Sequence, residues 1–265
     1  MFNSTHTLAG FSIARTGFDG WVPYATVTAV IAANLPDIEI LSGLRGTAAY
    51  LDNHRGITHT FVGVPVLALI LAAVMYYFSG HFWKTFAVSF VAMCTHPVLD
   101  YLNTYGVRPF LPFDRTWYYG DLLFIFDPYV DSILLLGLVA GALFNRRRAM
   151  AWLSLVLVIG YIGARIELRS LAAGQMEGFI AKTPGIDQWV VFPTMLNPFA
   201  WEGIAGTKTE WLKVNVNSLG GVGDEVVRIP RGAANDIVKR ASESESGAAL
   251  LRFARFPTFQ VDGLE

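Results

Sequence analysis

An uncharged apolar run at residues 61–78 constrains the fold of this chain more than any other feature of its sequence. A helix of that length comes close to crossing a bilayer core of roughly 30 Å. Composition agrees, because 53% of the residues are hydrophobic and 15% are charged, which is too apolar for an ordinary soluble protein. We therefore expect an all-α polytopic membrane domain of five to six helices. The other candidate spans are residues 82–102, 128–144 and 149–164, with weaker ones at 21–41 and 5–16.

The last third of the chain has a different composition. Residues 207–265 carry eight Lys or Arg and eight Asp or Glu, and the stretches 211–217 and 226–229 alternate as strands do. Residues 233–254 have the pattern of one or two helices. We expect three parts: a membrane-embedded helical domain at 1–170, an interfacial connector at 171–200, and a small soluble α+β domain at 201–265.

Charge and cysteine content narrow the classes of partner. The formal net charge is −1, which provides no basic surface for nucleic acid. The single cysteine, Cys94, excludes an intrachain disulfide. The first residues lack a basic region before an apolar core, so we expect no cleavable signal peptide. The lipid bilayer is therefore the expected partner. The sequence does not determine the oligomeric state.

Histidines and acids lie in or beside the apolar runs. Ionisable groups at membrane depth are costly, so they indicate a site. If successive helices alternate in direction, seven such side chains reach the same face of the membrane. They are His6, Asp37, His54, His59, His96, Asp100 and Asp127.

The charged loops suggest which face this is. Arg146, Arg147 and Arg148 fill a short loop at the opposite face. By the positive-inside tendency that face is cytoplasmic. We expect a multi-pass protein of the inner (plasma) membrane with its site on the external face.

Imidazole and carboxylate groups together are typical ligands of Zn²⁺, Mn²⁺ or Fe. His96 and Asp100 are spaced i, i+4 and project from one side of a helix. Seven potential ligands exceed the needs of one zinc ion, which favours two or three ions. Asp37 or Glu39 would act as the base of a hydrolytic reaction, and Arg55 would bind an anionic substrate group.

These motifs, taken in order, resemble the YdjM/YbcI type of inner-membrane metal-dependent hydrolases, some of them under SOS-response (LexA) control. Members often have aspartate where this chain has Glu39. The order of histidines and acids is more distantly similar to the zinc-dependent phospholipase C and P1 nuclease superfamily, which implies a trinuclear zinc site that cleaves phosphoesters. The matching motifs are His6 with Gly10, residues 35–39, residues 54–59, His96 with Asp100, Asp127-Pro128, and Asn197-Pro198-Phe199 with Trp201.

The function expected from these residues is a metal-dependent hydrolase that acts on a phosphoester or other ester of a lipid or amphipathic substrate. A metal transporter or storage protein would use the same ligands, but residues 61–78 and 128–144 offer almost no polar path. A membrane scaffold, with a merely structural polar cluster, is the third alternative. Asp127 before Pro128 serves equally well as a helix N-cap.

Overall fold

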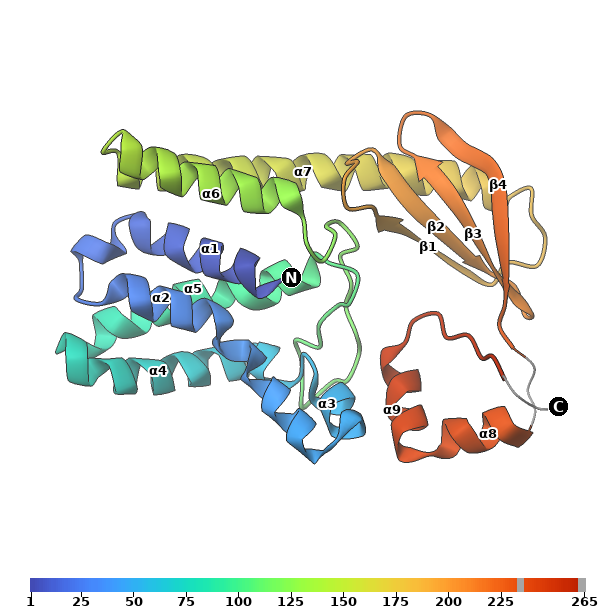
Figure 1. Cartoon of the computed structure of the whole chain (residues 1–265), viewed down its shortest axis with the longest axis horizontal. Helices are drawn as coiled ribbons and strands as arrows, with labels where there is room; N and C mark the ends of the chain where they lie inside the picture. The colour runs from blue at the N-terminus through green and yellow to red at the C-terminus, as the bar shows by residue number, and fades with distance from the viewer. Residues whose placement is uncertain (233–235, 262–265) are drawn as a thin grey trace. The chain divides into compact units, whose positions relative to one another are not determined.

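The computed structural model describes residues 1–232 and 236–261. Two compact units are formed, one by Met1–Glu39 with Arg55–Arg165 and one by Ile40–His54 with Ile166–Glu265. Figure 1 labels the elements of both units. The helical elements that precede α7 are α1 (Asn3–Arg15), η1 (Phe18–Gly20), α2 (Ala25–Asn34), η2 (Leu35–Arg45), α3 (Thr47–Asn53), η3 (Ile57–His59), α4 (Gly63–Ser79), α5 (Phe82–Tyr101) and α6 (Pro128–Leu143).

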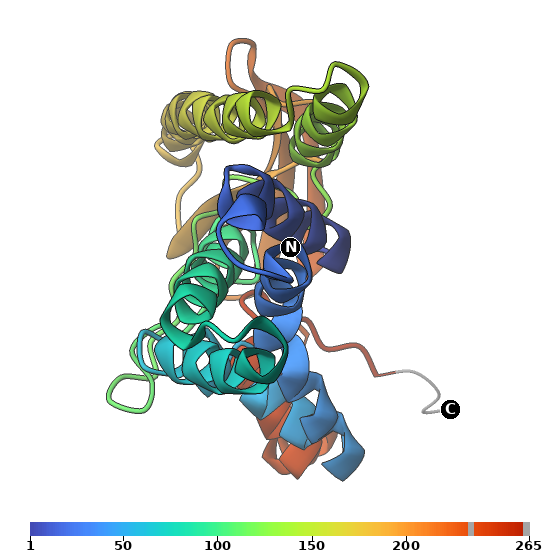
Figure 2. The same cartoon turned by 90° about the vertical axis from the view of Figure 1, so that its left-hand side faces the viewer.

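Small side chains form much of the interior of the first unit, where α1, α2, α4 and α5 pack together. These helices are seen nearly end-on in Figure 2. Gly10 lies so close to α2 that a Cβ atom there would be 2.7 Å from the Ala29 carbonyl oxygen. Small residues let helix backbones approach closely, as they do in membrane proteins. The fully buried alanines of this interior include Ala14, Ala29, Ala32, Ala68 and Ala92.

Large apolar side chains lie on the outside of the helices of this unit. On α4, Ile70 is 54% exposed and Tyr77 is 86% exposed. On α7 (Arg147–Ile180), Trp152 and Ile159 are exposed as well. Small residues inside and large apolar residues outside suit a helical unit surrounded by lipid.

The expected five to six membrane-spanning helices are not confirmed. Among the described residues, two helices are long and apolar enough to cross a membrane, Ala25–Arg45 and Arg147–Ile180. Thr47–His59 with Gly63–Ser79 would be a third if this pair, bent by 77°, is one broken span. A spanning helix needs about 20 residues. The apolar α6 has only 16 residues, and α5 has 20 but includes the polar pair His96 and Asp100.

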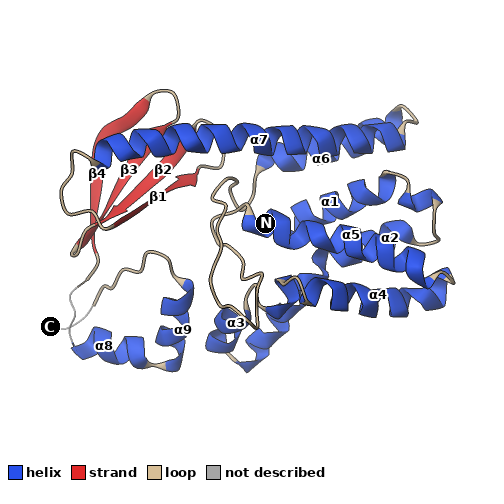
Figure 3. Cartoon of the chain, turned by 180° about the vertical axis from the view of Figure 1, so that it is seen from behind, coloured by secondary structure: helices blue, strands red, loops and turns tan. Residues whose placement is uncertain are grey.

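The second unit contains a four-stranded antiparallel sheet in the order β1-β2-β3-β4. The strands are β1 (Gln188–Pro193), β2 (Ala200–Gly206), β3 (Glu210–Asn217) and β4 (Gly221–Pro230). The last part of α7 lies along this sheet (Figure 3), with Ala172 and Met176 in one buried cluster with Trp201 and Leu212. The Trp201 indole donates to Ser218 Oγ at 2.8 Å, and Ser218 donates to the Leu168 carbonyl.

The α+β character of the C-terminal part is confirmed, and the alternating stretches lie in β3 and β4. Two helices follow, α8 (Asp236–Glu243) and α9 (Glu245–Phe253); residues 233–235 of the expected helical region lie outside the described residues. The stretch 171–200, expected to be an interfacial connector, holds the end of α7 and β1, and its interfacial position stays a prediction. The apolar run of β1 does not alternate, and it forms a strand by pairing with β2.

Candidate metal centre

Four side chains from three separate elements meet in the first unit. Asp37 is on η2, His59 ends η3, and His96 and Asp100 lie one turn apart on α5. One ligand atom from each of them lies within 4.8 Å of the other three. His59, His96 and Asp100 are buried, whereas the Asp37 side chain is 29% exposed. The group is thus a buried cluster with one partly open side.

The spacing of these atoms fits a single small cation. His96 Nε2 lies 3.4 Å from Asp37 Oδ1 and 3.7 Å from Asp100 Oδ2. His59 Nε2 lies 3.8 Å and 3.5 Å from the same two oxygens. Four ligands arranged tetrahedrally at ~2.1 Å from a zinc ion are about 3.4 Å apart. The four side chains therefore need only small movements to bind one ion.

The outer nitrogen of each imidazole has its own partner. His96 Nδ1 lies 2.6 Å from the Ala33 carbonyl oxygen at the end of α2. A carbonyl only accepts hydrogen bonds, so Nδ1 carries a proton, and Nε2 is the ring nitrogen directed toward the carboxylates. His59 Nδ1 lies 3.1 Å from Thr58 Oγ1 and 3.4 Å from Glu39 Oε2. Metal-ligating histidines usually have such outer partners.

The inner nitrogens strengthen the case for an ion. Among the described residues, neither His59 Nε2 nor His96 Nε2 has a hydrogen-bond partner, although both are buried. A buried polar atom without a partner is costly. A divalent cation between these nitrogens and the two carboxylates would satisfy both, so the residues present fit such an ion.

Glu39 lies outside the four-residue group and supports it. Its Oε2 accepts the Thr58 hydroxyl at 2.5 Å and the Gly56 backbone N–H at 3.1 Å, and its Oε1 accepts the Arg55 backbone N–H. These bonds fix the turn that leads into His59. The expected role of Glu39 as a base stays a prediction, while its contacts indicate a positioning role.

Arg55 is not placed as the expected anion-binding residue. Its side chain is buried, with Nε 2.9 Å from Asp100 Oδ2. Nη1 donates to Asn103 Oδ1 at 2.9 Å and to the Gly106 carbonyl at 2.8 Å. The guanidinium thus neutralises and orients Asp100, and a substrate phosphate would have to displace these internal acceptors.

His6 lies beside the group without belonging to it. Its ring stacks on that of His96 with centroids 3.7 Å apart, and its Nε2 is 3.5 Å from Asp100 Oδ1. The amine of Met1 contacts the same carboxylate oxygen. His6 therefore lies near Oδ1 of Asp100, whereas His59 and His96 lie near its Oδ2.

Two further expected ligands are not among the four. His54 belongs to the second unit, where its ring contacts Tyr50 and Phe253. Asp127 caps α6 by accepting the backbone N–H groups of Tyr129 and Val130, and burial raises the pKa of its carboxyl.

Three contributors were missed by sequence reasoning. Asn103 is buried between Arg55 and Asp100, Thr58 links Glu39 to His59, and the Ala33 carbonyl orients His96. A buried asparagine three residues after Asp100 could have been noticed from its spacing. Because every residue has a backbone carbonyl, the sequence cannot show which one orients His96.

The fold and the site together define a membrane protein with a candidate metal centre. Comparison with known protein families gives one match: the family described as "YdjM inner membrane protein" matches residues 1–171. The chain belongs to this family. The resemblance to the YdjM type is thereby confirmed, while the more distant similarity to the phospholipase C and P1 nuclease superfamily stays a prediction. All four residues of the candidate centre lie within the matched part.

One curated relative is similar over nearly the whole chain. It is "Uncharacterized protein YfhP" of Bacillus subtilis (strain 168), 26% identical over 275 residues that cover 99% of this chain and 82% of the relative. This similarity extends through the C-terminal sheet, beyond the family match. No solved structure matches the chain.

Proposed function

We propose that this protein is a membrane-bound, metal-dependent hydrolase that uses water to cleave an ester, more specifically a phosphoester, of a lipid or amphipathic molecule. One observation carries the proposal: the buried Nε2 atoms of His59 and His96 face the carboxylates of Asp37 and Asp100 at tetrahedral spacing. Structural zinc sites are rich in cysteine, whereas nitrogen and oxygen ligands are typical of catalytic ones.

Zinc is the proposed ion, with manganese and iron as the alternatives. When bound, such an ion supplies a Lewis acid that polarises an ester oxygen and makes water nucleophilic near neutral pH. The four-residue group accounts for one ion. The two or three ions expected from the sequence would need His6 Nε2 and Asp100 Oδ1 as additional ligands.

The residues around the ion have distinct proposed roles. Asp37 is the most exposed of the four, so water and substrate approach from its side, and its Oδ2 accepts a proton from the attacking water. Arg55 holds Asp100 in place through the 2.9 Å ion pair. Glu39 holds the His59 turn.

The location expected from the charged loops remains part of the proposal. Arg146 lies in the connection between α6 and α7, and Arg147 and Arg148 are the first residues of α7. A cytoplasmic position for them would place the metal centre toward the external face. A lipid substrate would then be cleaved at the outer surface of the inner membrane.

Hydrolysis by purified protein tests the proposal. Protein in detergent would be loaded with zinc or manganese and assayed with bis(p-nitrophenyl) phosphate and with vesicles that contain phosphatidic acid or polyprenyl phosphates. We expect turnover that chelation abolishes and metal restores. His96→Ala should lose turnover, while His81→Ala, a histidine that contacts Ser79 and lies outside the group, should retain it. If the metal-loaded protein cleaves no ester, the proposed hydrolase function is wrong, and metal storage or transport is the function left to test.

A further inference from the structure

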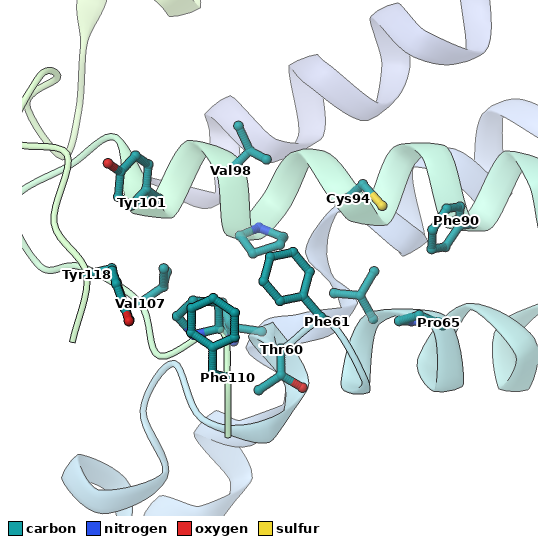
Figure 4. Close-up of a pocket in the computed structure, with 14 residues that line it drawn as sticks. Thr60, Phe61, Pro65, Phe90, Cys94, Val98, Tyr101, Val107, Phe110 and Tyr118 are labelled. Carbon is teal, nitrogen blue, oxygen red and sulfur yellow. The ribbon is translucent and has the colours of Figure 1, made fainter. Parts of the chain in front are cut away.

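A cavity of about 510 Å³ lies directly beside the candidate metal centre in the first unit. Figure 4 shows its walls: Phe90, Cys94 and Val98 come from α5, Phe61 precedes α4, and Phe110 belongs to the loop after α5. This volume falls within the ~300–1,000 Å³ typical of small-molecule sites. The cavity is large enough for a ligand and is distinct from the gap between the four metal-binding side chains.

The walls are suited to hydrocarbon. Aromatic and aliphatic side chains make up most of the lining, and the rings of Phe61 and Phe110 lie 5.4 Å apart. A polar or charged ligand would lose its hydration there and find few hydrogen-bonding side chains to replace it. An apolar chain would gain free energy by leaving water.

The cavity and the metal centre share part of their structure. His59 lines the cavity and belongs to the four-residue group. Pro97, next to His96 on α5, also lines it. A molecule whose apolar part fills the cavity therefore has its polar end beside the metal centre.

The rim of the cavity is exposed and apolar. Phe61 is 69% exposed, Val98 is 56% exposed and Phe110 is 44% exposed. In a chain with membrane-length helices, such a rim favours entry from the hydrocarbon of the bilayer rather than from water.

We propose that this cavity binds the hydrocarbon chain of a lipid whose ester group lies at the metal centre. The inference rests on the proposed function and specifies its substrate: a single-chain or multi-chain lipid with one acyl, alkyl or prenyl chain in the cavity. A second copy of the protein seated on the same rim is the competing occupant.

Cys94 provides the test, because it is the chain's single cysteine and lines the cavity. The full-length protein in detergent would be alkylated with N-ethylmaleimide in the presence of butyl, octyl or dodecyl phosphate, and the rate would be followed by mass spectrometry. The three ligands share one headgroup. Each additional buried methylene contributes ~0.8 kcal/mol, or about fourfold in affinity. We expect dodecyl phosphate to slow alkylation at least tenfold and butyl phosphate to leave it unchanged.

A pair of loop variants locates the protected site. Phe110→Gln removes an apolar wall, and we expect it to raise the dodecyl phosphate concentration needed for protection about tenfold. Phe113→Gln changes an 85% exposed phenylalanine of the same loop that does not line the cavity, and it should have no effect. Equal effects of the two variants would place the alkyl chain elsewhere and overturn the proposal.

The outcomes separate this inference from the proposed function. Equal protection by butyl and dodecyl phosphate, or none by either in protein that binds metal, overturns the hydrocarbon site alone. A third outcome is that alkylation is slow in an oligomer, fast after dissociation, and unaffected by alkyl phosphate. This outcome would assign the cavity to a protein interface and would also overturn the hydrocarbon site. Protection of Cys94 in protein that hydrolyses no ester supports the hydrocarbon site and overturns the enzymatic function.

Discussion

The imidazole of His96 donates from Nδ1 to the carbonyl oxygen of Ala33 at 2.6 Å. This bond joins α5 to the C-terminal end of α2 and leaves Nε2 directed at the carboxylates of Asp37 and Asp100. The orientation of a metal-binding side chain thus depends on how closely the helices pack. That packing depends in turn on Gly10, whose α-carbon faces Ala29 and Ala33.

Replacing Gly10 with alanine should destabilise the helical unit. The added Cβ would lie 2.7 Å from the Ala29 carbonyl oxygen and 2.8 Å from the Ala33 Cβ, and overpacking of this kind costs about 1–3 kcal/mol. Gly160→Ala is the matched control, because a Cβ at that helical glycine meets no described atom within 4 Å and helix propensity favours alanine by up to ~1 kcal/mol. Thermal unfolding in detergent measures both. A lower melting temperature for Gly160→Ala than for Gly10→Ala would contradict this account.

Glu39→Gln and Thr58→Val should each weaken metal binding. Both residues orient His59 from the side remote from the ion, and loss of such an outer partner typically reduces metal affinity about 10–100-fold. Competition with a fluorescent zinc chelator gives the affinities. Glu202→Gln, which alters an exposed pair with Lys213 on the sheet, is the control. Unchanged affinity in both site variants would show that His59 is oriented by other means.

Arg55→Met should unfold the protein more readily rather than only weaken substrate binding. The substitution leaves the buried Asp100 carboxylate without its guanidinium partner, and breaking a buried pair in this way costs about 3–5 kcal/mol. Arg15→Met removes a partly exposed pair with Asp19, which contributes at most ~1 kcal/mol. Denaturant titration compares the two variants. If Arg55→Met has normal stability but a raised KM, Arg55 would instead have the expected role of binding an anionic substrate group.

Removal of metal should lower the stability of the wild-type protein. An ion that binds only the folded state adds about 2.7 kcal/mol at a free concentration of 100 times its Kd. We therefore expect zinc to raise the melting temperature and a chelator to reverse the change. His96→Ala should show no zinc-dependent shift, whereas His81→Ala should respond as the wild type does. A zinc-dependent shift that persists in His96→Ala would place the ion elsewhere.

Part of the site follows from sequence rules. The i, i+4 spacing of His96 and Asp100 places both on one side of α5, and alternating helices bring Asp37 and His59 to them. Proximity of this set was predictable because it needs only helix geometry and chain direction.

Other parts depend on backbone conformation that no spacing encodes. Arg55 has a positive φ of 48°, and the chain changes direction there, so that His54 lies in the second unit and His59 in the first. The same turn buries the Arg55 side chain against Asp100. A histidine pair five residues apart therefore does not form a ligand pair.

The fold shows the same division between local and distant interactions. The alternating stretch in β3 was predictable because alternate residues are buried against α7. The apolar stretch of β1 was not, since only its pairing with β2 makes it a strand. The expected number of spanning helices is not confirmed, because it rested on apolar character, and only two or three apolar helices of the described residues are also long enough to cross a membrane.

X-ray absorption at the zinc edge would detect directly which atoms coordinate the ion. For purified protein loaded with one equivalent of zinc, we expect four nitrogen or oxygen neighbours at about 2.0–2.1 Å. The outer-shell scattering should be that of two imidazoles, and it should fall to that of one in His59→Ala. A sulfur neighbour at about 2.3 Å, which only Cys94 or a methionine could supply, or a spectrum unchanged in His59→Ala, would contradict the proposed metal centre.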